Sequence, residues 1–338
     1  MSAIDASTSA LRLTVLRQTA PKLAGRLLAT AIVVFLLVWV GHKAAGEPNV
    51  FFLVGLNGVT LAGLYFVVAS GFTLIFGLMR VVNMAHGSLY LLAGYIALVL
   101  QRDLGNWGVP LLVAVVSVAA IGLVMQQLFL RWNQGQELRQ ALITLAISII
   151  LADQMLAHFG AQPSDIKWPH QLDRSVPVHF YGLQYPFTRF FVLICALAVG
   201  LGLWVWLRKT RMGMIIRAGV DDRQMVSALG INIQLVFAVA FAVGAGLAGL
   251  GGVLGGSMIA VAPGEDSNFL LSSLVVVIIG GMGSLLGAAV GALLLGLVQV
   301  YSAIYLPVEW SNYSILLTFL LLVLVLAFRP LGLFGRPA

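Results

Sequence analysis

Charged residues are scarce in this chain. Asp, Glu, Lys and Arg together make up 9% of its 338 residues, whereas hydrophobic residues make up 60%. A soluble globular domain carries roughly a quarter charged residues, so a surface of this composition would not stay in water. The composition excludes an ordinary soluble domain and predicts an integral membrane protein.

Cysteine pairs and metal-binding patterns are also missing from the sequence. The one cysteine, Cys195, lies inside an apolar run and has no second cysteine with which to form an internal disulfide. The five histidines stand at spacings that suit no metal. The sequence has neither a G-x-x-x-x-G-K-[ST] phosphate-binding stretch nor an H-E-x-x-H motif. We therefore expect no cofactor, no bound metal and no ATP hydrolysis by this chain itself.

What the chain has instead is a series of long apolar runs. A helix needs about 20 apolar residues to cross the ~30 Å hydrocarbon layer of a bilayer. The third and eighth runs are short, so eight full spans with two half-length or re-entrant segments fit as well as ten spans. The candidate runs are 27–41, 51–79, 88–100, 109–130, 141–159, 187–207, 233–258, 269–279, 285–306 and 313–328.

The N-terminal run superficially resembles a secretory signal peptide. It follows several basic residues, but no small-residue cleavage pattern comes after it, and His42 and Lys43 follow directly. We interpret the run 27–41 as a first membrane span that is retained.

The basic residues indicate how the spans are oriented. The net charge is +7, but the 19 Lys and Arg residues lie in the gaps between apolar runs rather than on one soluble face, which argues against nucleic-acid binding. Cytoplasmic loops carry an excess of Lys and Arg. Placing the N-terminus inside puts fourteen of the 19 on the cytoplasmic side, so we expect both termini there. The inner set is Arg12, Arg17, Lys22, Arg26, Arg80, Arg131, Arg139, Arg208, Lys209, Arg211, Arg217, Arg223, Arg329 and Arg336; the outer set is Lys43, Arg102, Lys167, Arg174 and Arg189.

These observations predict an all-α, polytopic membrane protein with about eight to ten transmembrane helices, arranged as an inverted repeat of two five-span halves. An odd number of spans per half gives the halves opposite orientations, as in many transporters. Each half has a long glycine-containing run, a polar break and a short run; the breaks read NMAHG at 83–87 and PGEDS at 263–267. The expected divisions are a cytoplasmic tail 1–26, a first half 27–159, a periplasmic loop 160–186, a second half 187–328 and a cytoplasmic C-terminus 329–338.

Two loops of this arrangement are candidates for contact with partners. The loop 160–186 contains Trp168 and Tyr181, which suit either the headgroup layer or a partner-facing surface. The cytoplasmic loop 208–232 mixes arginines with two aspartates and an apolar set that ends at Gly230, which indicates a short amphipathic helix with a glycine C-cap. It is either a coupling element for a partner or a basic loop with incidental helicity.

Several stretches together resemble the branched-chain amino acid ABC transporter permease family over about residues 51–330. The first half carries NGVTL at 57–61, SGFTLIFG at 70–77 and VNMAHG at 82–87. The inner loop carries RAGVDD at 217–222 and LGIN at 229–232, and the region near the C-terminus carries GGMGSLLG at 280–287. Their order along the chain makes the resemblance specific at the level of the family.

The resemblance implies an inner-membrane permease subunit of a bacterial importer. Such a permease pairs with a second homologous permease, is driven by two cytoplasmic ATP-binding subunits, and receives its solute from a periplasmic substrate-binding protein. Branched-chain amino acids are then the expected solute, with urea or short-chain amides, which permeases of the same family carry, as the alternative. The tail before 27 and Gln299, where an acidic residue is common, depart from the family pattern. The residues implied to contact the ATPase are Arg217, Ala218, Asp221, Asp222, Leu229 and Gly230.

An ion-coupled secondary transporter is the main rival hypothesis. Such carriers tend to hold charged residues at mid-membrane for the coupling ion, and here Asp153 stands nearly alone within the spans. Asp153 either lines the solute pathway or pairs with a neighbouring helix near the outer interface. The other pathway candidates are polar residues that share a helix face or flank a break, although membrane-embedded Ser and Thr often bond only their own helix. These candidates are Asn57, Thr60, Thr73 and Asn83.

Two helix breaks complete the predicted site. The first contains His86 and Gly87, and Arg80 just before it suggests an inner gate or a structural turn near the cytoplasmic surface. The second contains Gly280, Gly281 and Gly283, whose lack of a side chain allows tight turns with positive φ and close packing.

Overall fold

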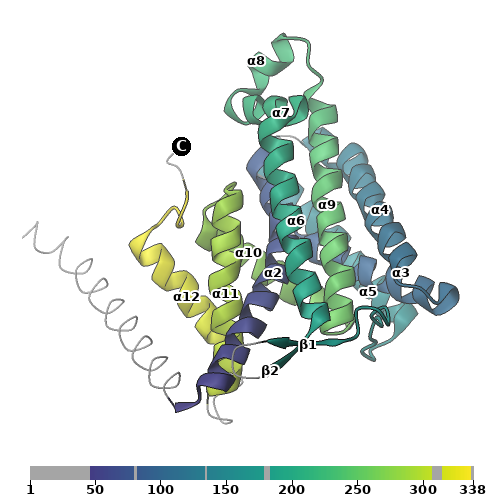
Figure 1. The fold of residues 1–338 in the computed structure, drawn as a ribbon. Helices are drawn as coiled ribbons and strands as arrows, with labels where there is room; N and C mark the ends of the chain where they lie inside the picture. Colours follow the sequence, from purple (N-terminus) through teal and green to yellow (C-terminus); the bar gives the residue numbers. More distant parts are fainter. Residues whose placement is uncertain (1–45, 80–81, 134, 179–182, 307–313, 336–338) are drawn as a thin grey trace, which may run out of the picture.

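The computed structural model describes residues 46–79, 82–133, 135–178, 183–306 and 314–335 (Figure 1). Within them, six helices are long and apolar enough to cross a membrane, and a shorter apolar helix follows near the C-terminus. The predicted all-α membrane architecture is confirmed, and each predicted run from 51 onward coincides with a helix. The predicted first span, 27–41, and the tail before it lie outside the described residues.

The helices follow the predicted order along the chain. Two of them, α3 and α10, fall where the sequence has its short runs, and each begins inside the predicted polar break. His86 and Gly87, predicted as break residues, are the first two residues of α3, and Glu265 is the first residue of α10. In chain order the elements are α2 (Pro48–Met79), α3 (His86–Leu104), α4 (Gly108–Met125), the π-helical turn η1 (Gln126–Leu130), the 3₁₀ turn η2 (Arg131–Asn133), α5 (Glu137–Phe159), β1 (Ser175–Val178), β2 (Leu183–Pro186), α6 (Phe187–Lys209), α7 (Arg211–Asp221), α8 (Arg223–Ala228), α9 (Ile233–Met258), α10 (Glu265–Gly280), α11 (Leu285–Tyr305) and α12 (Ser314–Phe328).

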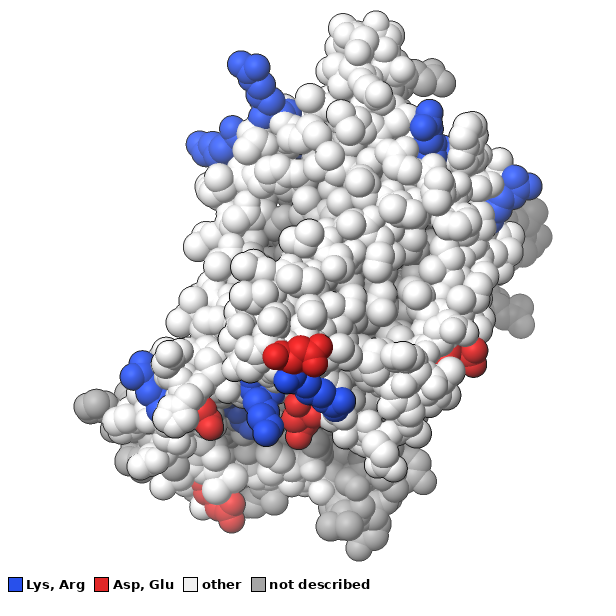
Figure 2. All heavy atoms as spheres, turned by 90° about the vertical axis from the view of Figure 1, so that its right-hand side faces the viewer, with Lys and Arg blue, Asp and Glu red and all other residues white. Residues whose placement is uncertain are grey.

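The surface is organised as a membrane protein requires. On the face shown in Figure 2, Lys, Arg, Asp and Glu gather toward the two ends, and a broad belt between them carries none. Such a belt suits the hydrocarbon layer, because charged side chains at its centre are costly. The chain is a multi-pass membrane protein.

The two longest helices, α2 and α9, cross at the centre through glycine. A Cβ atom added to Gly244 of α9 would lie 2.8 Å from the backbone oxygen of Gly71 on α2, and one added to Gly71 would collide with the backbone oxygen of Gly244. In lipid, small residues let helix backbones approach this closely, and packing then drives their association. The side chains around the crossing are buried, as Leu64, Phe72, Phe237 and Phe241 illustrate.

The N-terminal ends of the two short helices meet beside this crossing. The ring of Tyr90 on α3 stacks on that of Phe269 on α10, with centroids 4.0 Å apart. One turn earlier, Gly87 packs directly against the backbone of Asp266 and would bring an added Cβ to 2.9 Å from Leu270. Helix α3 therefore begins inside the protein, whereas the first turn of α10 is buried at Asp266 and exposed at Ser267 and Asn268.

The helix contacts repeat between the two halves, as an inverted repeat requires. Helix α2 packs on α10 and α11, and its counterpart α9 packs on α3 and α4. Helix α3 packs on α4 and α5, while α10 packs on α11 and α12. The ends match as well: Lys167, after α5, exchanges hydrogen bonds with Gln101 on α3, and Phe334, after α12, donates its backbone N–H to Gly280 on α10.

The loop between the halves is more structured than the sequence indicates. β1 and β2 form an antiparallel hairpin, with Val176 opposite Tyr185, and it lies at the end of the molecule opposite α7 and α8 (Figure 1). Upstream of it, Ser164 pairs with Val261 through two backbone hydrogen bonds, and Ile166 is fully buried. Trp168 stacks on Trp107 with ring centroids 5.4 Å apart. This part of the loop covers the break between α9 and α10 rather than lying flat on the headgroups.

The glycine turn between α10 and α11 has the predicted backbone. Gly281 has φ +96° and Gly283 has φ +82°, while Gly280 is the last helical residue and packs against Gly287. Gly281 also faces the segment after α12, where a Cβ would lie 2.8 Å from the Cα of Gly335. Both conformation and space therefore require glycine at 281.

We predict that Gly281→Ala destabilises the protein more than Gly264→Ala does. Gly264 has φ +95°, nearly the value at 281, but open space around the missing Cβ. Gly264→Ala incurs about 1–2 kcal/mol of left-handed strain. Gly281 has ψ +120° and lies outside the left-handed helical region, so Gly281→Ala incurs at least as much backbone strain and must also displace the C-terminal segment. Thermal unfolding of the purified variants in detergent measures the difference. Equal losses of stability would show that the contact with Gly335 does not constrain this turn.

Candidate functional site

The connector between α6 and α9 forms a projection at one end of the molecule (Figure 1). It consists of α7 and α8, so the single short amphipathic helix expected from the sequence is in fact two. Thr210 caps α7 by accepting a hydrogen bond from the backbone N–H of Gly213. Arg217 donates from its guanidinium to the backbone oxygen of Leu207, near the end of α6. These contacts hold α7 against the end of a membrane helix.

Asp222 forms the corner between the two connector helices. Its carboxylate accepts a hydrogen bond from the backbone N–H of Met225 at 3.0 Å, as an N-cap does. The predicted glycine C-cap is confirmed at the other end of α8, where Gly230 has φ +79° and its N–H donates to the oxygen of Ser227. Of the predicted apolar set, Val226 is buried, whereas Met225 and Leu229 are exposed.

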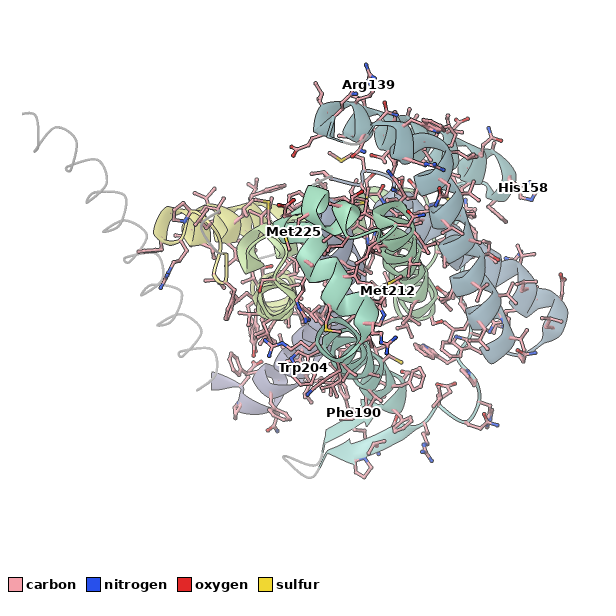
Figure 3. All side chains as sticks on the ribbon, turned by 90° about the horizontal axis from the view of Figure 1, so that it is seen from above. Arg139, His158, Phe190, Trp204, Met212 and Met225 are labelled. Atoms are coloured by element: carbon pink, nitrogen blue, oxygen red, sulfur yellow. The ribbon has the colours of Figure 1, made fainter. Side chains whose placement is uncertain are left out.

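The outer surface of the connector combines apolar side chains with basic ones. Met214, Met225 and Leu229 are 53%, 61% and 68% exposed, which is unusual for such side chains beyond a membrane span. Arg217 and Ala218 are exposed beside them. Figure 3 looks onto this end of the molecule, with Met225 and Met212 on the connector helices above the bundle. An apolar centre with a charged rim is the composition of a protein-docking surface.

The first helix break is buried against protein. His86 is fully buried; its Nε2 donates to the backbone oxygen of Val68 at 2.9 Å, and its ring meets the edge of Phe72. Asn83 accepts from the backbone N–H of Ala85, and neither Asn83 Nδ2 nor His86 Nδ1 has a hydrogen-bond partner among the described residues. The break is therefore enclosed by protein, as irregular backbone at membrane depth must be.

The polar residues predicted to share one face of α2, Asn57, Thr60 and Thr73, separate into two groups. Asn57 accepts a hydrogen bond from Arg189 at the start of α6, and Thr60 lies 3.0 Å from the hydroxyl of Tyr185 in the hairpin. Burial raises the pKa of the Tyr185 hydroxyl, which keeps it neutral. Asn57 therefore joins α2 to α6 and Thr60 joins it to the hairpin, and of the three residues predicted on α2 only Thr73 lines a cavity.

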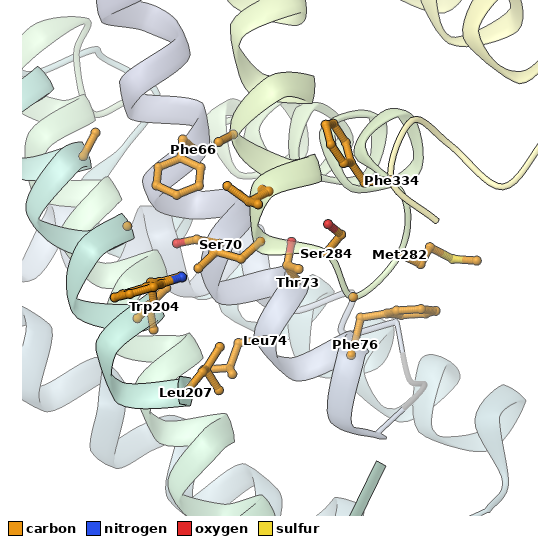
Figure 4. A pocket seen from close by; sticks show the side chains of 18 of the residues that line it. Phe66, Ser70, Thr73, Leu74, Phe76, Trp204, Leu207, Met282, Ser284 and Phe334 are labelled. Atoms are coloured by element: carbon orange, nitrogen blue, oxygen red, sulfur yellow. The ribbon is translucent and has the colours of Figure 1, made fainter. Parts of the chain in front are cut away.

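That cavity is a groove of about 2130 Å³ between α2, α6 and α11 (Figure 4). Its walls are mainly apolar and include Phe66, Trp204 and Leu207. Two of its hydroxyls are already engaged, because Thr73 donates to Ala69 and Ser70 to Val67 within their own helix. Its third hydroxyl, Ser284, caps the next helix by accepting from the N–H of Gly287. Charged side chains also line the groove, namely Glu137 at the start of α5, Arg208 at the end of α6 and Arg217 on α7.

The structure does not bring Asp153 to this groove. Asp153 and its neighbour Gln154 are exposed on the outward side of α5, away from the other pathway candidates. Figure 3 shows α5 at the edge of the molecule, with Arg139 and His158 near its two ends.

A hydrogen-bonded link between three helices was missed by the sequence reasoning. The hydroxyl of Tyr65 on α2 donates to Gln299 Oε1 on α11 at 2.5 Å, and Gln299 Nε2 lies 3.5 Å from the hydroxyl of Thr318 on α12. Gln299 stood out in the sequence only as a departure from the family pattern. Its partner is 234 positions away, and no local signal connects two such residues.

Comparisons with known proteins agree on one family. The family model described as a branched-chain amino acid transport system permease component matches residues 55–326. The chain is 31% identical over 306 residues to the high-affinity branched-chain amino acid transport system permease protein LivH of Escherichia coli K12, covering 86% of this chain and 98% of that protein. It is 29% identical to BraD of Pseudomonas aeruginosa, covering 83% and 95%. It is 26% identical to the E. coli permease protein LivM, covering 91% and 74%.

We predict that Asp222→Ala loosens α8 and that Asp222→Asn does not. Loss of an N-cap costs about 1 kcal/mol, whereas Asn caps as well as Asp. Exchange protection of the Met225 amide, which the cap holds, should therefore fall roughly fivefold in the alanine variant. Hydrogen exchange of the purified protein measures this. Equal protection in the two variants would mean that the cap does not hold the corner.

Proposed function

Because the chain belongs to the branched-chain amino acid transport system permease family, we propose that it is the membrane-spanning permease subunit of an ATP-driven importer for branched-chain amino acids. One observation carries the proposal: the family match, 55–326, extends without interruption through both helical halves and the connector between them. The curated relatives that match most of this chain are named for the same transport. The chain passes the solute and leaves ATP hydrolysis to partner subunits.

The connector is the surface on which the ATP-binding subunits dock in this proposal. Helices α7 and α8 offer exposed Met214, Met225 and Leu229 in a setting of arginines. Their corner is fixed by the Asp222 cap and by the bond from Arg217 to the end of α6. A rigid projection joined directly to α6 and α9 transmits movement of its partner to both helices.

The charge distribution supports a cytoplasmic position for this connector. Arg208, Lys209 and Arg211 stand where α6 passes into α7, and Arg329 follows α12. Cytoplasmic loops attract such basic residues. In a bacterial inner membrane this orientation leaves both termini in the cytoplasm and turns the hairpin of β1 and β2 toward the periplasm. There a periplasmic binding protein delivers the solute.

The chain resembles two kinds of relative named as permeases, LivH and LivM, and matches LivH at higher identity. We therefore take its partner in the membrane to be a second, homologous permease subunit. Selection of the solute rests largely with the binding protein, so the permease has only to conduct what is delivered.

Reconstitution tests the function directly. Proteoliposomes containing this chain, its companion permease, the two ATP-binding subunits and the binding protein should accumulate radiolabelled leucine only when ATP is present. Omission of the ATP-binding subunits should abolish uptake. Leucine uptake by this chain alone, driven by a proton or sodium gradient, would instead identify a secondary transporter.

We predict that the double variant Met225→Ala with Leu229→Ala weakens attachment of the ATP-binding subunits. Burying such a side chain contributes about 1.5–3 kcal/mol, so the pair of truncations should lower affinity by at least roughly tenfold. Leu331→Ala is the matched control, because Leu331 is 53% exposed at the same end of the molecule but lies outside the connector. Binding of the ATP-binding subunits to the reconstituted permease pair measures the effect. Unchanged affinity in the double variant would remove the docking role from α8.

A further inference from the structure

Helix α5 is the membrane span with the least contact to the rest of the described chain. In its most apolar stretch 11% of the residues are buried, compared with 78% in α2 and 56% in α9. Its inward side is held to α3 and to the turns η1 and η2. Its outward side leaves Leu142, Ile149 and Ile150 more than half exposed.

The outward side of α5 also carries a carboxylate. Asp153 is exposed there, with the amide of Gln154 beside it. Among the described residues, none forms an ion pair or a hydrogen bond with Asp153. Whatever covers this side of α5 therefore lies outside the described chain.

Contacts with α3 place Asp153 at membrane depth. The hydroxyls of Ser148 and Ser88 lie 2.8 Å apart, and the rings of Phe159 and Tyr95 stack at 4.2 Å. Asp153 lies between these two contacts and is therefore level with the middle of α3. At about 1.5 Å per residue, this part of α3 is roughly 10–20 Å from the charged residue Arg102 near its outer end. Along its own helix, Asp153 lies six residues, or about 9 Å, before the end of α5 at Phe159.

Contact with lipid is energetically unfavourable for this surface of α5. A carboxylate at the centre of a bilayer costs about 2.5–3.5 kcal/mol on insertion scales, and such groups usually face protein or water. The outward sides of two other spans are different. The exposed residues of α4 include Leu112 and Val116, and those along the middle of α6 include Leu197 and Leu201, with no charged residue among them.

We propose that the outward face of α5 is the surface on which the second permease subunit packs, and that this subunit offers Asp153 a hydrogen-bond donor or a cationic side chain. The proposal rests on the proposed function, from which it takes the pairing of two permeases. Ala146, Ile150, Asp153 and Ala157 recur at intervals of three and four residues and share one exposed side of the helix. The two alanines allow a neighbouring helix to approach closely.

Site-specific photocrosslinking tests the interface. The photoreactive amino acid benzoylphenylalanine is placed at Ile150 of α5 or, as a matched control, at Val116 of α4; the two native side chains are 60% and 65% exposed. In the complete complex in nanodiscs, irradiation should join this chain to the second permease from position 150. Position 116 should yield lipid adducts only. Lipid adducts from both positions, or a link from 150 within one chain, would overturn the proposal.

Substitution of Asp153 gives a second readout. Asp153→Leu removes the polar partner and should release the second permease during purification, whereas Asp153→Asn keeps a hydrogen-bonding group and should retain it. Insertion and folding of each variant are checked by its monomeric elution profile in detergent. A pair that survives equally well with leucine would contradict the assignment.

These experiments distinguish an error in the proposed interface from an error in the proposed function. ATP-dependent leucine uptake is measured on the same complex before irradiation. A complex that transports leucine but forms no adduct at 150 contradicts the interface alone. An adduct at 150 in a complex that fails to transport any branched-chain amino acid contradicts the proposed function alone.

Discussion

The crossing of α2 and α9 is the contact around which the two halves are arranged. Gly71 and Gly244 meet there with no side chain between the two backbones, and the helices are the most buried of the spans. The flanking helices of each half then pack on the long helix of the other half: α10 and α11 on α2, and α3 and α4 on α9. A larger residue at either glycine would therefore push apart the two halves of the protein, and not only these two helices.

The same arrangement gives the molecule its two functional ends. The short helices α3 and α10 begin beside the crossing and run away from it in opposite directions. The loop before α3 therefore closes one side of the protein, and the loop before α10 closes the other side. The outer loop reaches the break before α10 through Ser164 and Val261, and the connector α7–α8 stands at the other end. The proposed function requires this division, because in it solute arrives on one side and the ATP-binding subunits act on the other.

Much of the fold could be predicted from the sequence because it is encoded locally. Span α9 occupies the predicted residues 233–258, and Gly230 and Gly281 have the positive φ that their positions indicated. The site was less predictable because it depends on tertiary contacts. Thr60 meets a tyrosine 125 positions away, and the depth of Asp153 follows only from the pairing of α5 with α3. Chemical type alone does not tell whether a polar residue faces a pathway, a loop or another subunit.

The central claim is that the halves lie in opposite orientation about the α2–α9 crossing, with the connector and the outer loop on opposite sides of the membrane. Labelling with a membrane-impermeant maleimide tests it most directly, in a Cys195→Ala background carrying either Ser227→Cys on α8 or Gln171→Cys in the outer loop, both exposed positions. In cells with a permeable outer membrane and an intact inner membrane, the account predicts labelling at 171 and labelling at 227 only after the inner membrane is opened. Labelling of both positions from the same side would contradict it.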